Sequence, residues 1–432
     1  MTNTYEVNEK GQMEICGVNV LDLKEKYGTP LYVFNQNKIE AIATVFNETL
    51  KKEYGNGLIS YASKAFSCKE IYKIVDKLGL GTDTVSIGEL YTALKAGFNT
   101  EKIIFHGNNK SVDELSVAVK NGVKFIVLDS IEEANILNGI AREKGVIQGV
   151  LIRVNPGVEA HTHNFIQTAK PDSKFGFLIS NGDATNAIKT ILSLNNLNLL
   201  GLHCHIGSQI FEEKSFILAT DIMLDYYKEI KDTLGYDFEV LNLGGGFGIN
   251  YTEEDPKFTE SDYEKFLTKI INEVKVKISN NNLKKPFLIF EPGRSIVGEA
   301  GITLYSAGFT KEIKGIKNYI AIDGGMFDNP RFALYGAKYS VLTAERLNEK
   351  KEIKYTLAGK CCESGDIIAE NVMLPKIKYG EIIAVLSTGA YNYSMASNYN
   401  RNLIPPVVFI KDKKDRLVIK PQTLDDLIRN DL

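Results

Sequence analysis

The 432-residue sequence predicts an α/β protein, with an N-terminal (β/α)8 TIM barrel followed by a C-terminal, mostly antiparallel β-domain. Between about residues 57 and 295, short apolar runs alternate with longer segments of helical periodicity, which is typical of parallel α/β folds. After residue 295 the pattern changes to short β-rich runs separated by Gly, Asn and Pro. Because 44% of the residues are hydrophobic, the chain can bury a sizeable core, and its length favours two domains.

Eight strand-like runs carry the barrel prediction. They are LISYASK (58–64), GTDTVS (81–86), KIIFHG (102–107), KFIVLDS (124–130), GVLIRVN (149–155), LLGLHCHIG (199–207), VLNLGGGFG (240–248) and PFLIFEPGR (286–294). A closed barrel uses eight strand–helix units without leaving edge strands, so it is favoured over an open doubly wound sheet. Capping boxes mark three of the helix starts independently of hydrophobicity: Ser86/Glu89, Ser111/Glu114 and Ser130/Glu133.

The second domain is predicted from ITLYSAGFTKEI, NYIAIDGG, KYTLAGKCC, EIIAVLSTGAY and PPVVFIKD, which are short β-rich runs. Near the N-terminus, QMEICGVNVLDL and PLYVFN are also strand-like, and we assign them to this domain rather than to the barrel. The predicted boundaries are therefore 36–295 for the barrel, and 1–35 plus 296–432 for the β-domain.

Composition and charge exclude several classes of function. The net charge is −3, from 51 basic and 54 acidic residues, so the chain lacks the basic field that nucleic-acid binding requires. Five irregularly spaced cysteines without a CxxC pair argue against a metal site and indicate reduced thiols in a cytoplasmic protein. The polar N-terminus does not resemble a signal peptide, and no apolar run reaches the roughly 18 residues of a membrane span.

Polar residues gather where the predicted strands end, which in a TIM barrel is the face that carries the active site. The set comprises Lys64, Asp83, His106, Asp129, Arg153, His205, the glycine run of LGGGFG (243–248), and EPGR (291–294). Lys64 lies at the end of an apolar run. Burying an unpaired amine is costly, so this lysine is either solvated or takes part in the chemistry of the site. LGGGFG is either a tight turn or a nest of amides for a phosphate, and it lacks the spacing of a dinucleotide site or a P-loop. A reactive lysine and a phosphate cradle are together what pyridoxal 5′-phosphate needs.

A set of motifs extends over nearly the whole chain: YASKA, HCHIGSQ, LGGGFG, EPGR, NPRFALYGAKY, GKCCESGD and STGAYNYSMASNYN. In this order they resemble the diaminopimelate decarboxylase family of the alanine racemase-like, fold type III pyridoxal-phosphate enzymes. The resemblance implies a barrel with a C-terminal β-domain, pyridoxal 5′-phosphate as cofactor, and a homodimer whose active sites are shared across the interface. It also implies decarboxylation of meso-2,6-diaminopimelate at its D centre to give L-lysine and CO2.

The resemblance assigns roles to individual residues. Lys64 matches the Schiff-base lysine, His205 the histidine stacked on the cofactor ring, and Glu291 the carboxylate that keeps the pyridine nitrogen protonated. The other implied cofactor contacts are Asp83, Arg153, Ser208, Gly244, Gly245, Gly246, Gly293, Arg294 and Tyr391. For Asp83 and Arg153, salt bridges in the core are an equally good interpretation, and His203 fits a structural role.

Substrate selection is assigned to Arg294, Arg331, Tyr335 and Tyr391, together with Glu363, which matches the acceptor of the distal ammonium group. A guanidinium binds a carboxylate through two parallel hydrogen bonds, so two arginines favour a substrate with a second carboxylate. Cys362 matches the proton donor, and a thiol pKa of about 8.5 leaves it mostly protonated.

Phe332 and Ala169 depart from the family pattern. Two alternatives remain: a related ornithine, arginine or carboxynorspermidine decarboxylase, and a non-catalytic cofactor-binding homologue.

Overall fold

The computed structural model describes residues 3–158 and 173–432. Contacts within the chain divide it into two compact units. We call them the barrel unit (Ile42–Gly248 and Phe258–Gly293) and the β unit (Met1–Ala41, Ile249–Lys257 and Arg294–Leu432). The segment Ile249–Lys257, inside the predicted barrel range, groups with the β unit. Ala169 lies outside the described residues.

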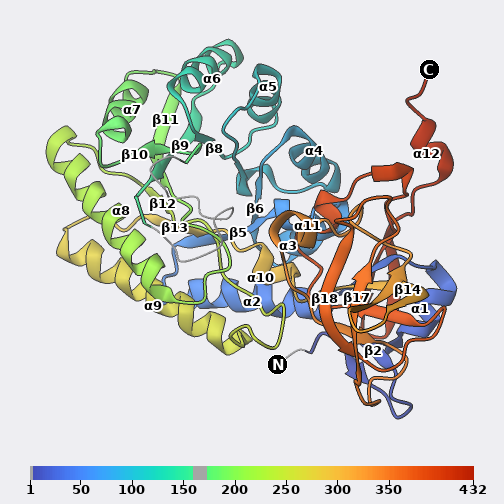
Figure 1. Ribbon diagram of the computed structural model, residues 1–432. Coiled ribbons are helices and arrows are strands. Elements are labelled where there is room, and N and C mark those ends of the chain that lie inside the picture. Colours follow the sequence, from blue (N-terminus) through green and yellow to red (C-terminus); the bar gives the residue numbers. More distant parts are fainter. Residues whose placement is uncertain (1–2, 159–172) are drawn as a thin grey trace. The chain divides into compact units, whose positions relative to one another are not determined.

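Parallel strands form a closed barrel at the centre of the barrel unit (Figure 1). In order around the ring they are β5 (Gly57–Ala62), β6 (Gly81–Thr84), β7 (Ile103–Phe105), β8 (Phe125–Leu128), β9 (Gln148–Asn155), β11 (Leu197–His203), β12 (Val240–Asn242) and β13 (Phe287–Phe290). The ring is closed because β13 pairs with β5 while β8 pairs with β9. Each predicted run overlaps one of these strands, although β5, β9 and β11 begin one or two residues before their runs, so the (β/α)8 prediction is confirmed. The two-residue β10 (Phe177–Leu178) adds a third parallel partner to β9, beside β8 and β11.

Apolar side chains fill the barrel. One buried cluster joins side chains from β7, β8, β9, β12 and β13: Ile104, Phe125, Val127, Leu151, Val240 and Ile289. Because these strands lie around the ring, their shared cluster makes the interior a packed core rather than a pore.

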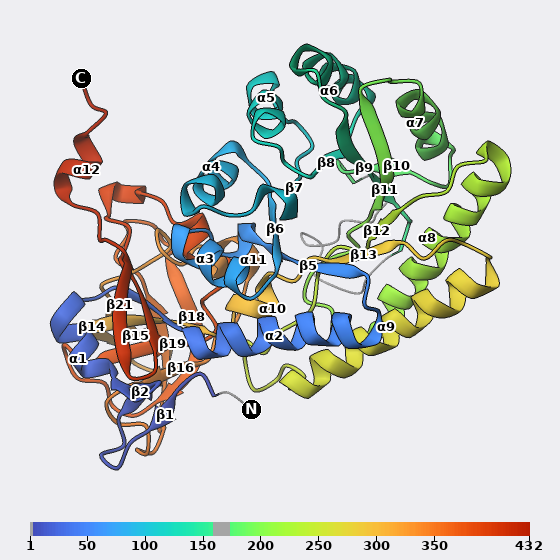
Figure 2. The same cartoon turned by 180° about the vertical axis from the view of Figure 1, so that it is seen from behind.

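Amphipathic helices surround the strands of the barrel unit (Figures 1 and 2). They are α2 (Gln36–Glu53), α3 (Lys69–Lys77), α4 (Ile87–Ala96), α5 (Val112–Lys120), α6 (Ile131–Lys144), α7 (Asp183–Leu192), α8 (Glu213–Leu234) and α9 (Glu260–Asn280). In α3, for example, Ile71, Tyr72, Ile74 and Val75 are buried, while Lys73 and Lys77 lie outside this buried group. In the described part of the chain, no helix combines the length and apolar character that crossing a bilayer would need.

All three predicted serine caps are present, but only one capping box is complete. Ser86, Ser111 and Ser130 each accept a hydrogen bond from the backbone amide three residues later. The reciprocal bond to the cap residue forms only at Ser111, from its amide to Glu114. Glu89 instead accepts from the Val85 amide, and Glu133 from the Asp129 amide, one residue before each cap.

The β unit is built on a mixed, mainly antiparallel sheet. Its strand order is β18 (Ile367–Leu374), β17 (Ile353–Ala358), β15 (Lys317–Ile322), β14 (Gly301–Ile313), β4 (Leu31–Asn35), β20 (Val407–Lys411) and β21 (Lys414–Ile419). β19 (Ile382–Val385) also pairs with β14 and with β16 (Val341–Thr343). The β15–β17 and β4–β20 pairs are parallel. PLYVFN is therefore a strand of this sheet, as expected.

The other N-terminal run, QMEICGVNVLDL, is only partly a strand, so that expectation was wrong for its second half. β1 (Glu6–Val7), β2 (Met13–Ile15) and β3 (Val18–Asn19) form a small sheet, and α1 (Val20–Tyr27) follows at once. The Asn19 side chain caps this helix by accepting from the Leu21 amide, and Val20 and Leu23 are buried on one face. Alternation of apolar and polar residues over so short a run does not distinguish a strand from a helix.

Candidate active site

The carboxyl ends of the barrel strands bring charged groups together. Lys64 lies in the short helix η1 (Ser63–Ala65) directly after β5, Asp83 lies in β6 and Arg153 lies in β9. His205 follows β11 and Glu291 follows β13. The charges of Glu291 and Lys64 act on the pKa of Asp83, and those of Lys64 and Arg153 act on the pKa of His205, so these groups lie near one another. The convergence of these predicted residues at one end of the barrel follows from the parallel strand order.

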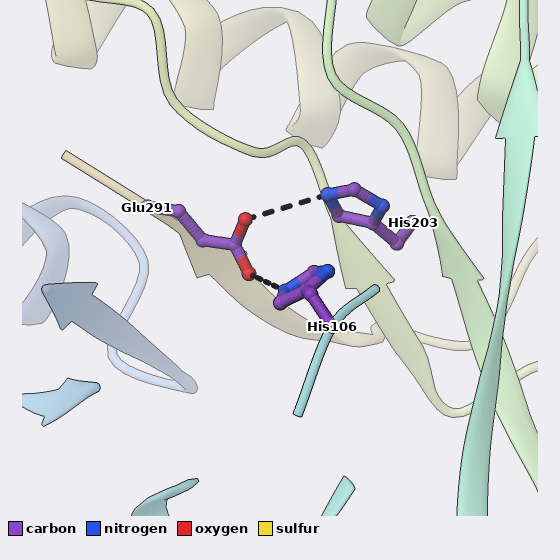
Figure 3. A group of neighbouring side chains, drawn as sticks. All are labelled: His106, His203 and Glu291. Carbon is purple, nitrogen blue, oxygen red and sulfur yellow. Dashed lines mark hydrogen bonds and ion pairs between the residues drawn. The ribbon is translucent and has the colours of Figure 1, made fainter. Parts of the chain in front are cut away.

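Glu291 is the centre of a buried hydrogen-bonded group (Figure 3). His106 Nε2 lies 2.8 Å from Glu291 Oε1, and Asn242 Nδ2 donates to the same oxygen at 2.8 Å. His203 Nε2 lies 3.3 Å from the other oxygen, Oε2. The two imidazole rings contact each other edge to face, with their centroids 4.6 Å apart. Oε1 of the carboxylate thus lies in hydrogen bonds with two side chains, while Oε2 lies at ion-pair distance from the His203 imidazole.

These contacts fix the charge state of the group. Burial raises the pKa of Glu291, but His106 and His203 outweigh burial and hold that pKa well below its usual value. Burial lowers the pKa of His203 to about 3 and also lowers the pKa of His106. The result at neutral pH is one ionised carboxylate beside two neutral imidazoles.

The same three side chains are of types that bind metal ions, and their candidate ligand atoms lie within 4.8 Å of one another. His106 makes a hydrogen bond to Glu291 at 2.8 Å, and His203 Nε2 lies at ion-pair distance, 3.3 Å, so direct contacts among the three side chains account for the arrangement. The absence of a metal site stays a prediction.

Lys64 and Asp83 form the second part of the group. Asp83 Oδ1 accepts from the Ser63 amide at 3.1 Å. Burial and the charge of Glu291 raise the pKa of Asp83 well above its usual value, although Lys64 acts in the opposite direction. The amine of half-buried Lys64 makes no hydrogen bond or ion pair with any residue that the structure describes. An amine in this position is available for chemistry.

His205 and the glycine run lie against each other. Burial, Lys64 and Arg153 hold the pKa of His205 well below its usual value, so its ring is neutral. Its Nδ1 accepts from the Gly245 amide at 3.4 Å. Nearby, Arg153 lies over the ring of Phe175, 4.1 Å from the centroid, and burial lowers its pKa.

The glycines of LGGGFG allow three loops to approach closely. A Cβ on Gly245 would lie 2.0 Å from the Glu291 carbonyl oxygen, and one on Gly246 would lie 2.3 Å from the Gly207 carbonyl oxygen. Gly246 also has φ +122°, a backbone conformation that side-chain-bearing residues rarely adopt. Its amide has no hydrogen-bond acceptor among the described residues. The glycine run therefore makes a tight turn, as one of the two interpretations expects. The Gly246 amide is also available to donate a hydrogen bond to an anion. Gly293 is equally enclosed, since its Cβ would lie 2.6 Å from Ala62 Cβ.

Within the β unit, two buried arginines share aromatic partners. Arg294 begins α10 (Arg294–Val297), and Arg331 begins α11 (Arg331–Tyr335). Both donate to the hydroxyl of Tyr251, Arg331 at 3.0 Å. The ring of Tyr391 lies under both guanidinium groups, 4.7 Å from Arg294 and 6.0 Å from Arg331. Tyr391 is held at φ +64°, which is unusual for an aromatic residue.

Arg331 carries its charge without an acidic partner. It is 8% exposed and donates to two phenols, Tyr251 and Tyr339, both at 3.0 Å. Burial lowers its pKa, but the two phenols outweigh burial and raise it above the usual value. No carboxylate pairs with it in the described ranges 3–158 and 173–432. A buried cation with only neutral partners is costly, and an anion bound to this guanidinium would offset that cost.

The GKCCESGD loop presents the other predicted residues of the β unit. Cys362 and Glu363 are exposed, whereas Cys361 and Asp366 are buried. Asp366 accepts from the Cys361 amide at 2.7 Å and from the Met326 amide at 2.6 Å, which anchors the base of the loop. The Cys362 amide donates to Asn400 at 2.7 Å. Tyr335 and Phe332 are both partly buried in α11, and Ser208 is partly buried after β11.

Sequence reasoning missed several members of these groups. His106 was recognised at a strand end but received no role, and Asn242, Tyr251 and Tyr339 were not considered. Asn242 ends a predicted strand directly before the glycine run, so its position was a usable signal. Tyr251 and Tyr339 are ordinary tyrosines in sequence, and only their contacts distinguish them.

Comparison with known proteins gives the family. A family model described as "Pyridoxal-dependent decarboxylase, pyridoxal binding domain" matches residues 40–298. A diaminopimelate decarboxylase from Bacillus methanolicus is 48% identical over 96% of this chain and 96% of the relative. Another from Bacillus subtilis (strain 168) is 46% identical over 99% and 97%. The crystal structure of diaminopimelate decarboxylase from m. jannaschii in co-complex with L-lysine is 34% identical, with TM-score 0.92 over 100% and 98% of the two chains. The chain therefore belongs to the diaminopimelate decarboxylase family of pyridoxal-dependent decarboxylases.

Proposed function

We propose that this chain decarboxylates meso-2,6-diaminopimelate at its D centre, yielding L-lysine and CO2. Full-length relatives at 46–48% identity carry the name diaminopimelate decarboxylase. The observation that carries the substrate assignment is Arg331, a buried guanidinium without an acidic partner among the described residues. A substrate with a second carboxylate would supply the missing charge.

Pyridoxal 5′-phosphate fits the barrel unit. The unbonded amine of Lys64, the free amide of Gly246 and the ionised carboxylate of Glu291 are the three groups that this cofactor needs. The proposed cofactor contacts are Lys64, Asp83, Arg153, His205, Ser208, Gly244, Gly245, Gly246, Glu291, Gly293, Arg294 and Tyr391. When bound, the cofactor supplies an electron-withdrawing ring for the electrons that remain after CO2 leaves.

Each residue contributes a definite step. Lys64 provides the covalent attachment, and the neutral ring of His205 offers a face for stacking. Glu291, whose pKa its neighbours hold low, would keep a proton on the ring nitrogen of the bound cofactor, and this would increase the electron demand of the ring. The thiol of Cys362 delivers a proton to the carbon that has lost CO2, and the resulting thiolate regains a proton from solvent.

Specificity is assigned to the β unit. Arg294 and Arg331 bind the distal carboxylate, assisted by Tyr335 and Tyr391. Glu363 accepts the distal ammonium group. Binding energy from this unreactive end of the substrate positions the bond that breaks.

We further propose a homodimer with shared sites in the cytoplasm. Exposure of Cys362 and Glu363 on an anchored loop supports their use by a second copy of the chain. Two-fold symmetry would then create two equivalent sites from one interface. All five cysteines are free thiols, which supports a reducing compartment.

Release of CO2 from meso-diaminopimelate, ornithine and arginine, compared side by side, tests the proposal. We expect turnover of meso-diaminopimelate alone. Turnover of ornithine or arginine instead would establish the related decarboxylase. No release from any of them, by protein loaded with cofactor, would favour a non-catalytic homologue.

A further inference from the structure

Tyr251 joins the two buried arginines of the β unit. Its hydroxyl accepts a hydrogen bond from Arg294 Nη1 and another from Arg331 Nη1. Its ring lies 5.1 Å from the Arg331 guanidinium carbon and 5.7 Å from that of Arg294. One phenol thus contacts two cations that come from helices 37 residues apart in sequence.

The position of Tyr251 is itself fixed by its surroundings. Its amide donates to Asp255 Oδ2 at 2.9 Å, and its carbonyl accepts from the Ser340 amide at 3.1 Å. Its ring meets that of Tyr339 edge to face, with centroids 5.6 Å apart. Contacts at the backbone, the ring and the hydroxyl thus restrain Tyr251. A restrained side chain can hold the groups that it contacts in defined positions.

Two guanidinium groups repel each other, and an acceptor that both of them share helps to hold them together. Burial raises the pKa of Tyr251, but Arg294 and Arg331 outweigh burial and lower it. The phenol oxygen, which accepts a hydrogen bond from both cations, therefore carries enhanced negative character, and this offsets part of their repulsion. The Nε–H and Nη2 groups of Arg331 make no hydrogen bond to a residue that the structure describes, so they can bind a further acceptor.

We propose that Tyr251 is a positioning residue that sets the spacing and direction of Arg294 and Arg331 for the distal carboxylate of the substrate. The inference rests on the proposed function, in which these arginines bind that carboxylate. It predicts that loss of the hydroxyl weakens ligands with a distal carboxylate and spares ligands without one.

The test uses the Tyr251→Phe variant of the cofactor-loaded enzyme and two product-like ligands. L-lysine retains the distal carboxylate, whereas 1,5-diaminopentane lacks it. We expect the KM for meso-diaminopimelate and the Kd of L-lysine, measured by calorimetry, to rise together by about tenfold, as for loss of a hydrogen bond to a charged group. The kcat and the Kd of 1,5-diaminopentane should change by less than about twofold, because the reacting end is untouched.

Tyr339→Phe is the matched control. Its hydroxyl contacts Arg331 and Asn392 but makes no hydrogen bond to Arg294. It should therefore raise the Kd of L-lysine by less than Tyr251→Phe does. An equal effect of the two variants, an unchanged KM in Tyr251→Phe, or an equal loss of affinity for both ligands would overturn the inference.

Arg331→Ala separates this inference from the proposed function. If Arg331→Ala raises the KM for meso-diaminopimelate and Tyr251→Phe does not, only the positioning role of Tyr251 fails. If Arg331→Ala leaves the KM unchanged, the arginines do not bind the distal carboxylate, and both proposals fail. Cofactor absorbance and thermal unfolding of each variant verify that the fold is retained.

Discussion

Asp328 makes the stability of the β unit depend on pH. The side chain is fully buried; it accepts from the Tyr305 hydroxyl and, at 2.7 Å, from the Gly325 amide. Burial raises its pKa from 3.8 to about 7. Between these two values the folded chain holds a proton that the unfolded chain has released. Stability contributed by this group is therefore complete below about pH 4 and is lost as the pH rises towards 7.

The size of the effect follows from the difference of about three pH units. At roughly 1.4 kcal/mol per unit, the full loss is about 4 kcal/mol, and about 3 kcal/mol of it falls between pH 5 and pH 8. The Asp328→Asn variant mimics the protonated acid at every pH and removes this dependence. We expect the variant to gain about 3 kcal/mol relative to the wild type between pH 5 and pH 8.

Urea denaturation of both proteins at a series of pH values measures the difference. Groups other than Asp328 titrate in both proteins and cancel in the comparison. If the difference between the urea midpoints of the two proteins stays constant from pH 5 to pH 8, Asp328 does not titrate in this range and the reasoning is refuted.

Three further predictions concern the active site. Lys64→Ala should abolish the cofactor adduct that borohydride traps, and an adduct mapped by mass spectrometry to another lysine would contradict the assignment. Arg331→Ala should lower kcat/KM for meso-diaminopimelate by about a hundredfold, as for loss of one partner of a buried charge pair; unchanged kinetics would point to another substrate. Mixing inactive Lys64→Ala with inactive Cys362→Ala under subunit exchange should recover about a quarter of wild-type activity, because about half of the dimers are mixed and each has one intact site. No recovery despite demonstrated exchange would place both residues in the same chain's site.

The sequence by itself determined the architecture of the barrel. Each strand is a short apolar run between polar segments, and such runs are visible without knowledge of their neighbours. Residues at strand ends were also predictable, because parallel strands in a closed barrel all end at the same face. Lys64, His205 and Glu291 were therefore recognised from position and motif together.

Local sequence was less informative where two local patterns compete. QMEICGVNVLDL alternates like a strand, yet Asn19 caps a helix that begins at Val20. Ser86 and Ser130 cap helices at the predicted starts. Their predicted partners, Glu89 and Glu133, form tertiary contacts and do not complete the capping boxes. Glu89 accepts from the Ser63 hydroxyl at 2.8 Å, and Glu133 lies 2.6 Å from the amine of Lys110.

Only the tertiary structure decided which side chains form hydrogen bonds with one another and which of them are charged. Glu291 meets His106 across 185 residues of sequence and Asn242 across 49. Of its neighbours, His106 and His203 hold its pKa well below the usual value. Tyr251 meets Arg331 across 80 residues. Charge states and hydrogen bonds depend on burial and on distances of a few ångströms between side chains. Such distances are set when strands and loops pack together, so no local pattern along the chain encodes them.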